Sequence, residues 1–87
     1  MAVLAVTYDL NKPGQDYTDL LKTIRSYPYA QLSKSSYANL TTEAPQAVYL
    51  KISPCLDKND NLFVITLSRP YSGHGPQMVD NWLAASL

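Results

Sequence analysis

The sequence predicts a single α+β domain over residues 1–87, with the element order β-α-β-β-α-β followed by an additional C-terminal helix. Two uninterrupted apolar runs, at residues 2–8 and 62–67, are typical of β-strands. Two stretches with helical spacing and one hairpin-like stretch lie between them. The chain of 87 residues has the length of one small domain, and its 46% hydrophobic and 16% charged residues argue against disorder.

The first half of the chain is expected to form a strand, a helix and a hairpin. The strand covers residues 2–8. The helix lies between Asp16, its expected N-cap, and Pro28, which stops it. The apolar positions with helical spacing in this segment are Leu20, Leu21, Ile24 and Tyr27. The roughly alternating pattern that follows predicts a hairpin with strands near 29–33 and 36–41.

The second half is expected to form a helix over 44–56, a strand over 62–67, a loop and a terminal helix. Pro45 lies in the first turn of the helix, where proline is tolerated, and Pro54 is expected to kink or end it. Proline and glycine residues within 69–76 predict the loop. The terminal helix has an apolar stripe formed by Met78, Val79, Trp82 and Leu83.

This element order is the ferredoxin-like pattern, in which both main helices cover one face of the sheet. In that arrangement the end of the first strand meets the beginnings of the third and fourth strands. The polar residues expected to gather at this end of the sheet are Asp9, Ser35, Ser36, Asp60 and Asn61. The residues expected to be largely buried are Leu4, Val6, Leu20, Ile24, Val64 and Ile65.

Four segments carry a resemblance that runs over nearly the whole chain. They are residues 6–17 (VTYDLNKPGQDY), 32–37 (LSKSSY), 56–65 (LDKNDNLFVI) and 81–83 (NWL). These segments resemble the SinR-like family of short bacterial and phage proteins, which is related to the second CRISPR-associated adaptation protein. The resemblance implies a ferredoxin-like homodimer that acts in a nucleic-acid, phage or mobile-element defence setting.

Asp9 is the candidate catalytic and metal-binding residue. The resemblance places it where members of the wider family, described as metal-dependent nucleases, carry an aspartate at the end of strand one. Mg²⁺ keeps several waters and needs only one or two protein carboxylates, so two copies of Asp9 facing each other across a dimer could hold one ion. A strand-end aspartate also commonly caps the following turn, which is the structural alternative. Asp60 is the second carboxylate expected at this end of the sheet, as a metal ligand or as a turn residue.

Partner-binding residues are expected among the basic and the aromatic side chains. The candidates for nucleic-acid contact are Lys12, Lys34 and Arg25, although a net charge of 0 gives the chain no overall attraction to nucleic acid. Seven tyrosines and a low charged fraction favour a surface that a second subunit covers. The candidates for this dimer interface are Tyr37, Met78 and Trp82.

The sequence therefore predicts a homodimeric binding or regulatory module whose partner is nucleic acid or a host protein. The alternative is a Mg²⁺-dependent endonuclease, acting on RNA or DNA, that uses Asp9 across the dimer. A second alternative is a small nucleotide-ligand binder that stacks its ligand on tyrosine. The binding module requires no cofactor. The chain contains no apolar run of membrane-spanning length and no signal-peptide pattern, so we expect a cytoplasmic protein.

Overall fold

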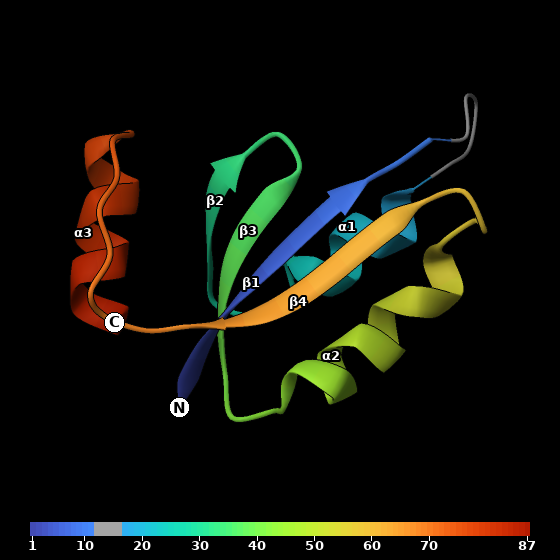
Figure 1. The fold of residues 1–87 in the computed structure, drawn as a ribbon, viewed down its shortest axis with the longest axis horizontal. Coiled ribbons are helices and arrows are strands. Elements are labelled where there is room, and N and C mark those ends of the chain that lie inside the picture. Colours follow the sequence, from blue (N-terminus) through green and yellow to red (C-terminus); the bar gives the residue numbers. More distant parts are fainter. Residues whose placement is uncertain (12–16) are drawn as a thin grey trace.

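The computed structural model describes residues 1–11 and 17–87 of the chain. Four strands form one antiparallel sheet in the order β2-β3-β1-β4, and three α-helices accompany it (Figure 1). The elements are β1 (Ala2–Asp9), α1 (Thr18–Ile24), β2 (Tyr29–Ser33), β3 (Ser36–Thr41), α2 (Pro45–Ile52), β4 (Asn61–Leu67) and α3 (Gln77–Ser86). The structure confirms the α+β class, the hairpin and the terminal helix.

Strand β1 lies between β3 and β4 and fixes the register of both. Val6 is opposite Tyr37 of β3 on one side and opposite Val64 of β4 on the other. The end of β1 meets the beginnings of these two strands, because Thr7 pairs with Ser36 and Asp9 pairs with Asn61. The polar sheet end expected from the sequence is therefore present.

One face of the sheet is covered by α1 and α2, and the main core lies there. Side chains alternate between the two faces of a strand, so Leu4, Val6 and Tyr8 of β1 all point toward these helices. The buried residues of this core are Leu4, Val6, Tyr8, Leu20, Ile24, Tyr37, Val48, Ile52 and Leu62. Four of the residues expected to be buried, Leu4, Val6, Leu20 and Ile24, are in this list, and Val64 packs against it as a half-buried residue.

The opposite face of the sheet, which we call the open face, is covered only in part. Helix α3 packs against β2, apart from α1 and α2 (Figure 1). On this side Val3, Ala30 and Ala38 are buried. Over β4, in contrast, Phe63 is 63% exposed and Ile65 is 54% exposed. The expectation that Ile65 is buried is wrong, because its side chain points away from α1 and α2, and because α3 lies over β2 at the opposite edge of the sheet.

The helix boundaries differ in detail from the sequence expectation. Helix α1 ends at Ile24, before Pro28, and its expected cap Asp16 lies outside the described residues. Helix α2 begins with Pro45 in its first turn and ends at Ile52, where a short 3₁₀ turn containing Pro54 takes over. Proline thus acts as expected at both ends of this helix, since it fits the first turn and cannot continue the ladder of hydrogen bonds.

The helices of residues 1–11 and 17–87 were compared with what a membrane span requires. None of the helices there combines the length and the apolar character needed to cross a bilayer.

Candidate functional site

Asp9 and Asp60 lie at the same end of the sheet but in different environments. Asp9 is exposed at the end of β1, opposite Asn61, and its carboxylate accepts no hydrogen bond from another described residue. Ser35 is also at this end, where its carbonyl oxygen accepts a hydrogen bond from the Tyr8 amide at 3.0 Å. The topology thus brings the expected polar residues together, while leaving the Asp9 carboxylate open to solvent.

The Asp60 carboxylate joins three segments of the chain. One oxygen accepts the Asn11 amide at 2.7 Å, and the other accepts the Tyr17 hydroxyl at 2.7 Å and the Asp57 amide at 2.8 Å. Asn11 adds a hydrogen bond from its side-chain amide to the Asn59 carbonyl at 3.0 Å. These bonds tie the exit of β1 and the start of α1 to the turn before β4. This arrangement supports the turn role for Asp60, because both of its carboxylate oxygens already accept hydrogen bonds from neighbouring segments of the chain.

A complete metal centre is not formed by one copy of the described chain. Among residues 1–11 and 17–87 there is no group of three or more His, Cys, Asp or Glu side chains that could hold an ion. The donor set at Asp9 is a single carboxylate, with Asn61 as its strand neighbour. A single carboxylate can supply one ligand to Mg²⁺, which keeps several waters in its coordination shell.

Arg25 and Tyr37, which were expected at different surfaces, contact each other. The Tyr37 hydroxyl accepts hydrogen bonds from Nε of Arg25 at 3.3 Å and from Nη2 at 2.8 Å, and the guanidinium lies 5.7 Å from the ring centroid. Tyr37 is only 1% exposed, because its ring is part of this chain's own core, and its expected role at a dimer interface stays a prediction. Arg25 remains exposed, but its guanidinium is hydrogen-bonded to the Tyr37 hydroxyl and lies against the Tyr37 ring.

The other nucleic-acid candidates are Lys34 and Lys12. Lys34 is exposed in the β2–β3 turn, and its carbonyl accepts the Tyr8 hydroxyl at 3.3 Å. Burial raises the pKa of Tyr8, and the neighbouring Tyr37 raises it further, so this hydroxyl stays protonated as a donor. Lys12 lies outside the described residues. Arg25 and Lys34 alone provide few phosphate contacts.

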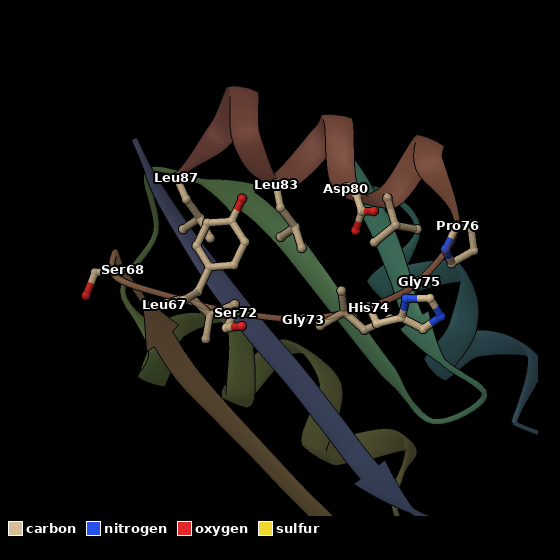
Figure 2. Close-up of a pocket in the computed structure, with 13 residues that line it drawn as sticks. Leu67, Ser68, Ser72, Gly73, His74, Gly75, Pro76, Asp80, Leu83 and Leu87 are labelled. Atoms are coloured by element: carbon tan, nitrogen blue, oxygen red, sulfur yellow. The ribbon is translucent and has the colours of Figure 1, made fainter.

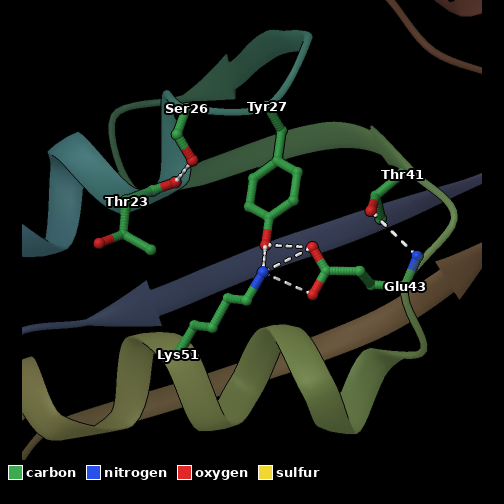
Figure 3. A network of polar contacts seen from close by, with 6 residues as sticks. All are labelled: Thr23, Ser26, Tyr27, Thr41, Glu43 and Lys51. Carbon is green, nitrogen blue, oxygen red and sulfur yellow. Dashed lines mark hydrogen bonds and ion pairs between the residues drawn. The ribbon is translucent and has the colours of Figure 1, made fainter.

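Tyr27, Glu43 and Lys51 form a polar clip on the helix-covered side (Figure 3). Lys51 donates to one Glu43 oxygen at 2.8 Å and lies 2.7 Å from the other, while the Tyr27 hydroxyl donates to Glu43 at 2.9 Å. The hydrogen bond from Lys51, with that from Tyr27, lowers the pKa of Glu43. The clip connects the segment after α1, the loop before α2 and α2 itself, which indicates a structural role.

A cavity of about 290 Å³ is lined by α3, by the loop before it and by Leu32 of β2 and Leu67 of β4 (Figure 2). Leu83 and Asp80 of α3 and His74 of the loop face this space in Figure 2. Tyr71 also lines it and offers an aromatic surface for stacking. The charged lining residue is Asp80, and a carboxylate repels phosphate. The nearby Arg69 donates instead to the carbonyls of Leu87 at 2.6 Å and Ala84 at 2.9 Å. This cavity is therefore poorly suited to a nucleotide.

An exposed apolar feature lies on the uncovered half of the open face; we call it the β4 patch and define it by Phe63 and Ile65. Both side chains are more than half exposed, and both point away from α1 and α2. On α3, Met78 is 79% exposed whereas Trp82 is half-buried against β2. Sequence reasoning missed the β4 patch, because an uninterrupted apolar run does not show which face of its strand is covered. The signal that could have found the patch is the element order, because its two main helices cover only one face of the sheet and leave the other face of β4 exposed.

Comparison of the chain with protein-family models, with curated proteins and with solved structures finds no match. The similarity to the SinR-like family thus stays a prediction from the sequence segments.

Proposed function

We propose that this protein is a homodimeric, ferredoxin-like binding module that holds a protein partner on the open face of its sheet. The observation that carries the proposal is the β4 patch. Phe63 and Ile65 expose 63% and 54% of their surfaces on the same face of β4, next to the short side chains of Thr7 and Ala5 of β1. Large apolar side chains on a regular element are a typical core for a protein–protein interface.

A protein partner suits this surface better than nucleic acid does. Strand β4, Asn61–Leu67, carries no charged side chain. Nucleic-acid binding draws most of its affinity from clustered lysine and arginine. On the described surface Lys51 is paired with Glu43, and Arg69 is bonded to the end of α3. The resemblance to the SinR-like family suggests that the partner belongs to a phage or mobile-element defence setting.

Capture from a host lysate with matched variants tests the proposal. The wild type, a double variant Phe63→Ser/Ile65→Ser and a control Leu50→Ser are used as bait. Leu50 is 58% exposed on α2, so the control removes a comparable apolar group from the helix side. We expect a stoichiometric protein with the wild type and with Leu50→Ser, and its loss with the double variant. Equal capture by all three baits, or no partner with the wild type, would count against the proposal.

A Mg²⁺-dependent nuclease is the second candidate function, because the Asp9 carboxylate is exposed where a substrate phosphate can reach it. Labelled single- and double-stranded RNA and DNA are incubated with the protein in Mg²⁺, Mn²⁺ or EDTA, alongside Asp9→Ala. Metal-dependent cleavage that is lost in Asp9→Ala, with the fold retained, would establish the nuclease. The binding module predicts no cleavage that depends on Asp9.

A further inference from the structure

Strand β4 presents unused backbone hydrogen-bonding groups at the edge of the sheet. It is the last strand in the order β2-β3-β1-β4, so no other strand in the described ranges pairs with its outer side. The Tyr8 amide donates to Ser35 on the β3 side of β1. In an antiparallel ladder the backbone groups of successive residues point to opposite sides, so Thr7, paired with Phe63, bonds toward β4. The outward-pointing groups of β4 are therefore those of Leu62, Val64 and Thr66.

This edge lacks the features that normally prevent strands from pairing. Asn61–Leu67 contains no charged residue, no proline and no glycine. The pairing of β4 with β1 runs without a β-bulge. Natural edge strands are usually short, charged, interrupted by proline or covered. A regular apolar edge of this kind is expected to be covered in the functional protein.

We propose that a second copy of this chain covers the edge, with the two β4 strands antiparallel about a two-fold axis at Val64. In this register Val64 is opposite Val64 of the second copy, and Leu62 is opposite Thr66. All three residues with outward-pointing backbone groups then exchange hydrogen bonds. A symmetric dimer requires a self-complementary surface, and this register provides it. The inference rests on the proposed homodimeric module and specifies how its two copies meet.

The side chains of β4 agree with this register. Phe63 of one copy is opposite Ile65 of the other on the open face, at a Cβ separation of about 5 Å. Aromatic and β-branched residues are a favourable cross-strand pair.

The pairing has two consequences for function. It joins two β4 patches into one continuous apolar surface across the two-fold axis, which enlarges the area offered to a partner. It also keeps the two Asp9 carboxylates apart. Three strand spacings and the shift along the strands separate them by about 25 Å, on the usual strand dimensions. One metal ion cannot bridge that distance, so this dimer excludes the shared-metal form of the nuclease.

A proline substitution tests the pairing with a matched control. Thr66 is exposed and its amide points outward, so Thr66→Pro removes an edge donor without removing a bond to β1. Thr66→Ala keeps the amide. We expect the wild type and Thr66→Ala to have twice the 9.7 kDa chain mass in sedimentation equilibrium. Thr66→Pro should raise the dimer Kd at least about tenfold, which corresponds to ~1.4 kcal/mol, while circular dichroism shows a retained fold. Equal Kd values for the folded Pro and Ala variants would overturn the pairing.

Amide hydrogen exchange on the wild type provides a second test that does not depend on any variant folding. The amides of Leu62, Val64 and Thr66 should gain protection as protein concentration rises, while those of Phe63 and Ile65 stay protected throughout by β1. Fast exchange at Leu62, Val64 and Thr66 in a protein of dimer mass would overturn the pairing and indicate another interface. A monomer at all concentrations would overturn it as well. Partner capture by the β4 patch is scored separately, so failure of the edge pairing is distinguishable from failure of the binding module.

Discussion

The two faces of the sheet differ in what their apolar residues do. On the helix-covered face Leu4 and Val6 are fully buried beneath α1 and α2. On the open face Phe63 and Ile65, one strand away, expose more than half of their surfaces. The same kind of residue thus contributes to folding stability on one face and is available to a partner on the other. Substitutions of equal chemistry on the two faces should therefore have unequal effects.

The largest expected effect comes from placing a charge in the core. Val6→Asp puts a carboxylate beneath α1 and α2, where it has neither water nor a cation. An uncompensated buried charge costs at least about 3–5 kcal/mol, which is most of the stability of a small domain. We expect Val6→Asp to show no cooperative unfolding transition in urea. Ile65→Asp, on the open face, should lose no more than about 1 kcal/mol at the same low protein concentration. Equal losses would show that the two faces do not differ.

The second effect is a difference in stability loss between substitutions of Asp60 and of Asp9, the two carboxylates at the end of the sheet. Asp60→Ala removes the acceptor of the Asn11, Tyr17 and Asp57 bonds. Hydrogen bonds to a charged group are worth about 1.5–3 kcal/mol, so we expect a loss of about 3 kcal/mol in the free energy of unfolding. Asp9→Ala removes an exposed carboxylate and should change that energy by less than about 0.5 kcal/mol. Denaturation of both variants in parallel measures this difference, and a larger loss for Asp9→Ala would reverse the assignment.

A smaller effect concerns the polar residue in the core. Asn39 is completely buried, and its side-chain amide donates to the Ile24 carbonyl at the end of α1 at 3.0 Å. Its oxygen Oδ1 has no hydrogen-bond partner among the described residues. Asn39→Ala leaves the Ile24 carbonyl without this donor, at a cost of about 1–2 kcal/mol, because the loss of an unsatisfied oxygen offsets part of the penalty. A thermal melt that shows stabilisation would contradict the bond's role.

The smallest effect is a pH dependence from the clip on the helix-covered side. The pKa of Glu43 is lowered in the folded state, above all by its hydrogen bond from Lys51. The folded protein therefore holds this proton less tightly than the unfolded chain does. Its contribution to stability is present above the ordinary glutamate pKa and is lost as the pH falls through the lowered value. We expect Glu43→Gln to flatten the acid side of the melting-temperature profile slightly. An unchanged profile would mean that the ion pair contributes nothing.

The sequence carried enough information to predict most of the helices and strands, but not which faces of the strands are buried by other parts of the chain. The apolar run of β1 and the alternating residues of the hairpin depend on local pattern, and both strands of the hairpin have the predicted bounds. The position of Pro45 likewise marks the start of α2 from a local steric rule. Ile65 was misplaced because its exposure depends on where α3 packs. That packing is set by tertiary contacts with β2, which no local pattern in β4 contains.

The candidate site was predictable only in part, for the same reason. Topology alone brought Asp9 to the polar sheet end with Asn61. The role of Asp60 as an acceptor for Asn11 and Tyr17 depends on residues more than forty positions away. The sequence could not show that Tyr37 points into the core, because a tyrosine suits an interface and a buried site with a polar partner equally well.

Photo-crosslinking of the purified protein most directly tests the central claim, that two copies of the chain meet along β4 at the edge of the sheet. A benzophenone amino acid replaces Phe63 in one preparation and Leu50 in another, two positions that are 63% and 58% exposed on opposite sides of the sheet. We predict a covalent species of twice the 9.7 kDa chain mass from position 63 and none from position 50. Crosslinked dimer from position 50 with none from position 63 would contradict the account.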